Sequence, residues 1–259
     1  MSGLPKTLSL TVDGAVAILR LDRAAKRNAI DDVTVEGIGA FFAAPPKGVK
    51  AIVLHGAGDH FCAGLDLSAL GELSATDGIA HSRMWHRAFE RIEFGVVPVV
   101  AVLHGAVVGG GLELAASAHI RMAESSAFYA LPEGQRGIFV GGGGSVRIPR
   151  LIGVARMADM MLTGRVYSSE EGQQAGLTQY LVGAGEGLAR GIELAKKIAT
   201  NADMTNFAVI QALPRIAESG RDAGLLTEAL MASIAQAEPE AKKRMGNFLA
   251  KRAAKVEKR

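Results

Sequence analysis

The sequence has little of what secreted or membrane-spanning proteins need. Its 259 residues include one cysteine, Cys62, which excludes a disulfide framework and any metal site built from several cysteines. The longest stretch without charge, Phe94–Leu112, contains Pro98, His104 and five glycines, so it is a poor candidate for a membrane span. No charged start followed by an apolar core and a small-residue cleavage site stands near Met1. We therefore expect a cytoplasmic protein.

Charge is unevenly distributed along the chain. Residues 241–259 include eight Lys or Arg and one acid, Glu257, which gives this tail a charge of +7. Because the net charge of the chain is +3, the preceding 240 residues sum to −4. A basic face across the body of the protein, as a nucleic-acid-binding surface requires, is not indicated.

The sequence is rich in apolar residues, at 49%, and it has 32 glycines. Short runs of Val, Ile and Leu alternate with longer amphipathic stretches, a pattern typical of an α/β core with mainly parallel strands. Pro98 places the start of its run at a sheet margin or bulge. The runs predict strands over Ala15–Asp22, Val49–His55 and Val96–Leu103, and weaker ones over His119–Ala123 and Gln179–Val182. The stretches predict helices over Asp32–Phe42, Gly78–Phe94, Leu112–Ser117, Arg156–Leu162 and Ser169–Ala175.

The last part of the sequence carries helical patterns only. Strand patterns cease after about Gly185, and the remaining stretches predict helices over Gly187–Thr200, Met204–Glu218, Ala223–Gln236 and Pro239–Lys255. We therefore expect an α/β core over residues 1–190, which carries the functional site. A helical region over residues 191–259 would cap this core or supply an oligomer interface.

Two predicted strands lead directly into glycine-containing loops. The first loop, Gly56–Asp66, follows AIVLH, and the second, Gly105–Ala115, follows VVAVLH. In an open α/β sheet, ligands bind beyond the carboxyl ends of the strands. Unpaired N–H groups at loop and helix starts can hold a developing negative charge there. One such loop is equally well explained as a tight turn, whereas two loops with an acid on the second are far more specific.

One glutamate lies at the end of the second loop and another follows it. Glu113 lies in the first turn of a predicted helix that is otherwise made of Leu and Ala, and Glu133 follows 20 residues later in the sequence LPEG. A carboxylate at a helix start can be no more than a partner of the helix dipole, and both acids can be solvated surface residues. The run Gly141–Gly144 lies shortly after the second acid.

Taken together, these motifs resemble the crotonase, or enoyl-CoA hydratase, superfamily over nearly the whole chain. Each motif alone is weak, but their order and spacing are specific. They are Lys26–Ala29 (KRNA), Ala63–Asp66 (AGLD), Gly109–Ala115 (GGGLELA), Pro132-Glu133, Gly141–Gly144, Leu162–Gly164 (LTG), Ala175–Leu177 (AGL) and Phe248–Arg252 (FLAKR). The resemblance implies an α/β fold of the crotonase type, in which a spiral of strand–strand–helix units is followed by a C-terminal helical trimerisation region.

The resemblance also implies a site. The N–H groups of Leu65 and Gly110 match the oxyanion hole that grips the thioester carbonyl of an acyl-CoA. Glu113 and Glu133 match the two catalytic glutamates, and Gly141 matches a glycine whose N–H touches the reacting water. The residues that match CoA-binding elements are Arg23, Lys26, Arg27, Ala63, Gly64, Leu65, Asp66 and Leu67.

Two residues near the C-terminus, Phe248 and Lys251, resemble residues that reach the CoA of a neighbouring subunit in hexameric members. The resemblance therefore implies trimers that pair into hexamers. It implies no metal and no redox cofactor, because CoA is part of the substrate.

The implied chemistry is physically sound. Adding water to a conjugated thioester moves negative charge onto the carbonyl oxygen, and removing one of the N–H donors that stabilise it typically costs roughly 3–4 kcal/mol. We expect Glu113 to orient and deprotonate the water and Glu133 to deliver a proton to C2. Two carboxyl groups at close range share one proton and titrate as a coupled unit.

Other side chains favour a structural interpretation. Cys62 and His60 beside the first loop could form a nucleophile pair, but a lone cysteine is more often a small buried apolar residue. Trp85 is expected to pack in the core in preference to lining an acyl pocket. Histidines five residues apart, such as His55 and His60, do not share the one-face helical spacing of a metal pair, so we expect no metal site.

The predicted function is the reversible hydration of a 2-enoyl-CoA to a 3-hydroxyacyl-CoA, a lyase reaction. Many members of the superfamily have Pro where this chain has Val140 after the bulky Phe139, which favours a short acyl group. A branch acting on (methylthio)acryloyl-CoA looks similar here. The alternatives are an enoyl-CoA isomerase, an acyl-CoA hydrolase, a catalytically silent subunit, or an RNA-binding relative that uses the basic tail. Retention of both acids favours water addition.

Overall fold

The computed structural model describes residues 3–69, 71–250 and 252. The chain is divided into two units, Met1–Ala199 and Thr200–Arg259. The predicted boundary between residues 190 and 191 lies inside helix α7 (Gly187–Ala199), which packs against the sheet of the first unit. No helix in the described part of the chain combines the length and the hydropathy needed to cross a bilayer.

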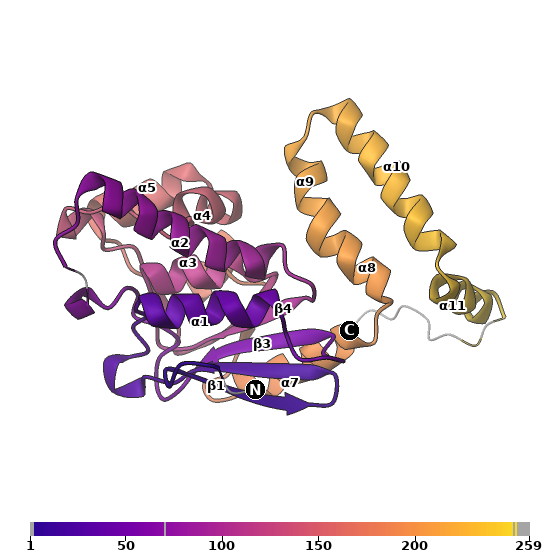
Figure 1. The fold of residues 1–259 in the computed structure, drawn as a ribbon, viewed down its shortest axis with the longest axis horizontal. Coiled ribbons are helices and arrows are strands. Elements are labelled where there is room, and N and C mark those ends of the chain that lie inside the picture. Colours follow the sequence, from indigo (N-terminus) through magenta and orange to yellow (C-terminus); the bar gives the residue numbers. More distant parts are fainter. Residues whose placement is uncertain (1–2, 70, 251, 253–259) are drawn as a thin grey trace. The chain divides into compact units, whose positions relative to one another are not determined.

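A six-stranded sheet forms the centre of the first unit, in the order β1-β2-β3-β4-β6-β9 (Figure 1). β1 and β2 form an antiparallel hairpin, and every other neighbouring pair is parallel. The carboxyl ends of the parallel strands therefore meet at one edge of the sheet, and the predicted α/β class is confirmed. The strands are β1 (Leu8–Asp13), β2 (Val16–Leu21), β3 (Ala51–Gly56), β4 (Val99–Leu103), β6 (Ile120–Glu124) and β9 (Tyr180–Val182).

Both faces of this sheet are covered, which explains the continuous apolar runs of β3 and β4. Ile52 and Leu54 belong to the core beneath α1 (Asp32–Ala43), α2 (Ala75–Glu93) and α3 (Gly110–Ser117). The alternate residues of β3 belong to the smaller core beneath α7. Figure 1 shows α1 and α2 on one side of the sheet and α7 on the other.

Two strand predictions need correction. The strand predicted from Val96 begins at Val99, because Pro98 has no N–H and only its carbonyl oxygen joins the ladder, as acceptor from the N–H of Ile52. β1 was not predicted, although its sequence LSLTVD has the alternation of a half-exposed edge strand.

A second, three-stranded sheet was also not predicted. Its order is β5-β7-β8, where β5 (Ala106–Val108) is parallel to β7 (Phe128–Ala130) and β8 (Tyr167–Ser168) is antiparallel to it. Strands of two or three residues carry too little periodicity to be seen in a sequence. Gly105 separates β4 from β5 with a φ of +51°, and a Cβ at this position would lie 2.0 Å from the carbonyl oxygen of Asp59. Only glycine can make this turn.

The remaining helices of the first unit are α4 (Gly144–Ile152), α5 (Val154–Thr163) and α6 (Ser169–Ala175). α4 was not predicted, because it begins within the glycine run and contains Pro149. α2 begins at Ala75, three residues before the predicted start, because the Ser74 hydroxyl caps it by accepting the N–H of Asp77.

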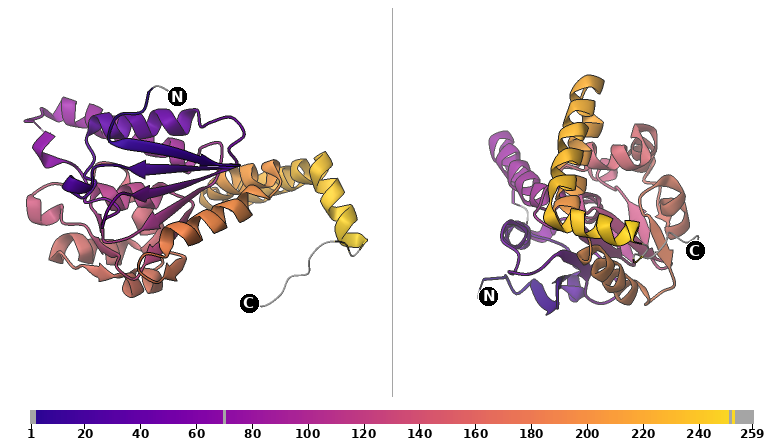
Figure 2. Two further views of the ribbon diagram at one scale, coloured as in Figure 1. Left: turned by 90° about the horizontal axis from the view of Figure 1, so that it is seen from below. Right: turned by 90° about the vertical axis from the view of Figure 1, so that its right-hand side faces the viewer.

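In the second unit, all regular structure within the described residues up to 250 and at 252 is helical, as predicted. The stretch predicted as one helix over Met204–Glu218 is divided into α8 (Asp203–Phe207), a π-helical turn (Ala208–Ala212) and α9 (Leu213–Glu218). α10 (Arg221–Ala237) and α11 (Pro239–Leu249) follow, coloured yellow in Figure 2. The helix predicted to reach Lys255 ends at Leu249, and residues 251 and 253–255 lie outside the described residues.

Candidate active site

Two backbone segments approach closely beyond the carboxyl ends of β3 and β4. Leu65 forms a parallel bridge with Ile30, in which the N–H of Ile30 donates to the Gly64 carbonyl at 2.9 Å and the N–H of Asp66 donates to the Ile30 carbonyl at 2.8 Å. This pattern leaves the N–H of Leu65 on the side away from the bridge. Gly110 begins α3, so its N–H has no acceptor within the helix.

The N–H groups of Leu65 and Gly110 lie side by side. A Cβ built on Gly110 would be 3.4 Å from the Leu65 nitrogen, and one built on Gly64 would be 3.3 Å from the Gly110 nitrogen. Within the described residues, no hydrogen bond uses either N–H. The structure thus brings together the two donors that the sequence predicted for an oxyanion.

The two segments that carry Leu65 and Gly110 can lie this close only because glycines stand at the points of contact. Gly64 has a φ of +97°, and a Cβ there would lie 2.8 Å from the Val108 carbonyl oxygen. A Cβ on Gly111 would lie 2.3 Å from the carbonyl oxygen of Cys62. Gly111→Ala is therefore expected to destabilise the first unit by about 1–3 kcal/mol through overpacking. The midpoint of urea unfolding measures the change, and an unchanged midpoint would contradict this close contact.

Glu113 is buried, with 3% of its surface exposed, and two N–H groups hold its carboxylate. Its Oε1 accepts hydrogen bonds from the N–H groups of Gly142 and Gly144, both at 2.8 Å. Burial raises the pKa of Glu113 from 4.5 to about 7, against the lowering effect of these two donors. The sequence analysis missed this role of Gly142 and Gly144, although the run Gly141–Gly144 was a visible motif.

Glu133 approaches the same place from the opposite loop. Its Oε1 lies against Gly109, where a Cβ would be 2.5 Å from that oxygen. Its Oε2 is buried and has no hydrogen-bond partner among the described residues. Burial raises the pKa of Glu133 above its ordinary value, and the charge of Glu133 in turn helps to raise the pKa of Glu113.

One cavity of about 280 Å³ connects these groups. Leu65, Gly110, Glu113, Glu133 and the predicted Gly141 all line it. The rest of the lining is mainly apolar, with two polar side chains, His81 and Ser82, on α2. It consists of Leu73, Gly78, His81, Ser82, Trp85, Ile138, Phe139, Val140 and Gly142. A mainly apolar cavity with a few convergent polar groups is the usual form of a small-molecule site.

Trp85 packs in the core, as the sequence predicted, and it also lines the cavity. The residue is 3% exposed, and its ring meets Phe89 edge-on with centroids 5.5 Å apart. Cβ atoms on Gly110 or Gly142 would each lie 3.0 Å from the Trp85 ring. The ring therefore forms a wall directly beside the paired N–H groups.

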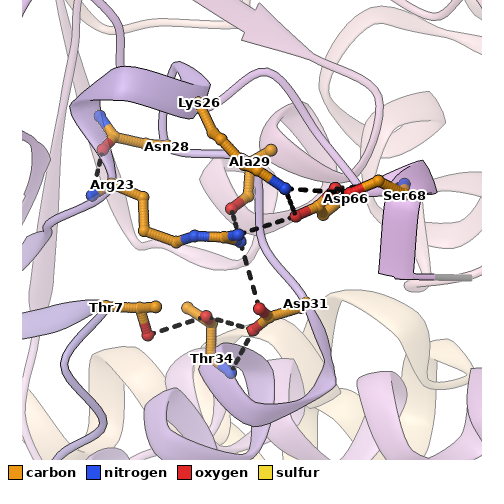
Figure 3. Close-up of polar contacts among 9 residues, drawn as sticks. All are labelled: Thr7, Arg23, Lys26, Asn28, Ala29, Asp31, Thr34, Asp66 and Ser68. Atoms are coloured by element: carbon orange, nitrogen blue, oxygen red, sulfur yellow. Dashed lines mark hydrogen bonds and ion pairs between the residues drawn. The ribbon is translucent and has the colours of Figure 1, made fainter.

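Two of the basic residues predicted to bind CoA, Arg23 and Lys26, form an ion-pair cluster (Figure 3). Arg23 pairs with Asp66 at 2.8 Å and with Asp31 at 3.2 Å. Lys26 pairs with Asp66 at 2.9 Å and donates to the Ser68 hydroxyl at the same distance. These contacts hold the pKa of Asp66 far below its usual range, with the Ser68 hydrogen bond as the largest cause.

The other predicted CoA-binding residues lie around this cluster. Arg27 is exposed, and its side chain makes no ion pair within the described part of the chain. The N–H of Ala63 donates to the Arg27 carbonyl at 3.0 Å, and Leu67 is 45% exposed. In the second unit, Phe248 lies on α11 and is 60% exposed. Lys251 lies outside the described residues, so the roles of Phe248 and Lys251 remain predictions.

Asn28 is a supporting residue that the sequence analysis named only as part of a motif. Its amide nitrogen donates to the carbonyl oxygens of Ala57 and His60 at 2.8 and 2.6 Å, and its Oδ1 accepts the N–H of Arg23 at 2.9 Å. The side chain is 1% exposed and the residue has a φ of +55°. Asn tolerates this conformation better than most residues, which a sequence alone does not reveal.

The Cys62–His60 nucleophile is not supported by the geometry. Cys62 is fully buried, and this burial raises the pKa of its thiol to about 12. The Nδ1 of His60 accepts the N–H of Ala106 at 3.0 Å, so the ring is used to hold β5. Across the described residues, no group of three or more His, Cys, Asp or Glu side chains could hold a metal ion.

Comparison with known proteins identifies the family and similar folds. The model of the enoyl-CoA hydratase/isomerase family matches residues 11–259. A crystal structure from Rhodopseudomonas palustris CGA009 is 55% identical, with a TM-score of 0.94 over 99% of this chain and 100% of that one. The short-chain-enoyl-CoA hydratase of Clostridium acetobutylicum is 31% identical over 85% of both chains.

Other relatives are much longer proteins. The fatty acid oxidation complex subunit alpha of Shewanella amazonensis is 41% identical over 151 residues, which are 57% of this chain and 21% of that protein. The chain thus spans about a quarter of the length of several curated relatives that it matches.

Proposed function

Because the chain belongs to the enoyl-CoA hydratase/isomerase family, we propose that it adds water reversibly to a 2-enoyl-CoA to give a 3-hydroxyacyl-CoA. One observation carries the proposal: two buried carboxyl groups and two N–H groups without partners among the described residues line the same cavity. This set supplies a base, an acid, and two N–H donors for the negative charge that develops on the thioester oxygen.

The proposed reaction starts with the thioester oxygen accepting both N–H groups, from Leu65 and Gly110. Glu113 takes a proton from water as the oxygen of that water bonds to C3, and electron density moves to the thioester oxygen. Glu133 then gives its proton to C2. Transfer of the proton from Glu113 to Glu133 restores the starting state, so the net change is the addition of one water.

The structure supports this division of roles between the acids. Two N–H donors on Oε1 of Glu113 favour its charged form, as a base requires. The Oε2 of Glu133 is buried without a partner in the described structure, which favours its protonated form. Burial raises the pKa of both groups, that of Glu113 to about 7, so we propose on the hydrogen bonds alone that the shared proton lies on Glu133 when water attacks. No metal or redox cofactor enters this scheme, since the chain supplies each group that it needs.

Isomerisation of the double bond is the second candidate, because the matching family includes isomerases. Moving a proton along the acyl chain needs one acid, whereas water addition uses two. Loss of the conjugated-thioester absorbance of crotonyl-CoA in water measures hydration, and its gain from a 3-enoyl-CoA measures isomerisation. Hydration at least tenfold faster than isomerisation is expected, and the reverse order would overturn the proposal.

We propose that the acyl group is short. Trp85 lines the cavity beside Gly142 and is backed by Phe89, and Val140, 7% exposed, also lines it. Trp85→Ala is expected to raise kcat/KM for a six-carbon enoyl thioester, relative to crotonyl-CoA, by about tenfold, since each accommodated methylene contributes about 0.8 kcal/mol. A panel that also includes branched, aromatic and (methylthio)acryloyl thioesters would identify the preferred substrate. An unchanged ratio in Trp85→Ala would show that this ring does not limit the acyl chain.

We propose that the exposed side chain of Arg27 binds the phosphates of CoA. Arg27→Ala is expected to raise KM for crotonyl-CoA about 3–10-fold without changing kcat, as loss of one solvent-exposed charge contact implies. The crotonyl thioester of pantetheine lacks the nucleotide phosphates and should show no change. An equal rise in KM with both substrates would contradict this role.

We further propose a trimer or a dimer of trimers. α10 exposes apolar side chains at Leu226, Leu230 and Ile234, spaced four residues apart on one helix face. Such a face on the second unit is typical of an interface. Light scattering during size-exclusion chromatography would give the mass, and a monomer would contradict this proposal.

A further inference from the structure

The guanidinium of Arg23 connects two segments at the point where they pair. Its Nη1 donates to the carbonyl oxygen of Ala29 at 2.7 Å, and its Nη2 donates to Oδ2 of Asp66 at 2.8 Å. Ala29 precedes Ile30, and Asp66 follows Leu65. Arg23 therefore spans the Ile30–Leu65 bridge from one side of the pair to the other (Figure 3).

Asp66 is held firmly enough to act as an anchor. The residue is 7% exposed, and its Oδ2 also accepts from Nζ of Lys26. Its Oδ1 accepts the hydroxyl of Ser68 at 2.6 Å, which fixes the second oxygen. A carboxylate held at both oxygens cannot turn without breaking several charge-assisted hydrogen bonds.

The same contacts leave Arg23 poorly suited to bind a phosphate. Its side chain is 19% exposed, and Nη1 also pairs with Asp31, the residue that caps α1 by accepting the N–H of Thr34. Two acidic partners and one carbonyl oxygen already engage both terminal nitrogens. A CoA phosphate would have to displace these partners and bring its own negative charge close to two carboxylates.

We propose that Arg23, through Asp66, is a positioning residue that fixes the N–H of Leu65 for the developing oxyanion, and that it is not a CoA ligand. This inference deepens the proposed function and rests on it. An N–H donor is effective only when it is fixed before charge develops, and a misplacement of about 1 Å can cost about 100-fold in rate. Loss of Arg23 removes the link between Asp66 and the Ala29 carbonyl across this bridge, while the Ile30 backbone bonds remain.

The test compares two substrates, crotonyl-CoA and crotonyl-pantetheine, which lacks the nucleotide phosphates. In Arg23→Ala, kcat is expected to fall about 10–100-fold with both thioesters, with KM changed less than threefold. Asp66→Asn should show the same pattern, and Arg23→Lys should recover part of the rate because one ammonium group cannot reach both acceptors. Arg20→Ala is the matched control, since Arg20 and Asp22 form an exposed ion pair of the same 2.8 Å length.

Acetoacetyl-pantetheine gives a second readout, independent of turnover. Its enolate carries a negative oxygen that the two N–H groups would stabilise, and the enolate absorbs light where the neutral form does not. Bound enolate absorbance should appear with the wild-type protein, fall in Arg23→Ala and Asp66→Asn, and persist in Arg20→Ala. A purely structural loss would instead appear as altered thermal unfolding without this selective optical change.

The outcomes separate the two proposals. A fall confined to crotonyl-CoA, or no fall with either thioester, would overturn the positioning role while hydration by the wild-type protein still stood. A wild-type protein that hydrates neither thioester would overturn the proposed function, and the enolate signal would then decide the inference alone. Enolate absorbance that is absent from the wild type, or equal in Arg23→Ala, would overturn the inference.

Discussion

Glu113→Gln is expected to lower kcat for hydration by about 10²–10⁴-fold, with KM changed only a few-fold. The glutamine oxygen can still accept the N–H groups of Gly142 and Gly144, so the loop keeps its shape. The amide cannot take a proton from water, which removes general-base catalysis. Steady-state rates on crotonyl-CoA measure the effect.

In Glu133→Gln, kcat for hydration should fall by a similar factor. The reason is complementary: the amide cannot deliver a proton to C2. The two acids act on one substrate as a unit, so the double variant should lose far less than the product of the two single losses. Glu124→Gln is the matched control. Glu124 is a second buried carboxylate that accepts two glycine N–H groups, from Gly185 and Gly187, but it does not line the cavity. A loss in the control as large as in Glu113→Gln, or full activity in both acid variants, would remove the basis of the mechanism.

Glu113→Gln is also expected to stabilise the folded protein at alkaline pH. The pKa of Glu113 is about 7 in the folded protein, against 4.5 for an ordinary glutamate, and desolvation is the main cause. Below pH 4.5 the carboxyl group is neutral in both the folded and the unfolded chain. As the pH rises from 4.5 to 7 the unfolded chain ionises first, so folding stability is lost over this interval. Glu113→Gln removes that loss.

Urea unfolding at two pH values measures this prediction. At pH 8 the free energy of unfolding of Glu113→Gln should exceed that of the wild type by up to about 3 kcal/mol. At pH 5 most of the difference should disappear. Any change in packing caused by the amide is independent of pH, so the difference between the two pH values isolates the ionisation. If the wild type were more stable than the variant at pH 8, other interactions would compensate for the free-energy cost of burying the Glu113 carboxylate, and the prediction would be wrong.

The central sheet and both acids could be predicted because their sequence patterns are local. The run at β4 is apolar at every position and the run at β3 is apolar from Ala51 to Leu54, and the structure buries both strands on both faces. Glu113 and Glu133 were found through the glycine loops beside them. The meeting of strand ends at one edge of the sheet predicted a site at the two loops, and the resemblance to the crotonase superfamily implied that both acids belong to it.

Features created by contacts between distant segments could not be predicted. Arg23 and Asp66 are 43 residues apart, and Gly142 is 29 residues from Glu113, so neither contact has a local pattern. The sequence placed Arg23 among the CoA ligands by resemblance, whereas its two acidic neighbours appear only after folding. The short strands β5, β7 and β8 were missed because two or three residues define no period.

The burial of Cys62 has a chemical consequence for a protein of this proposed function. A conjugated thioester is an electrophile, and a nearby thiolate would add to its C3 as readily as water does and stay attached. Cys62 lies within the first glycine loop, yet it is fully buried, and this burial raises the pKa of its thiol to about 12, so the sulfur stays protonated at neutral pH. The catalyst is thereby protected from alkylation by its own substrate, and its activity should survive iodoacetamide.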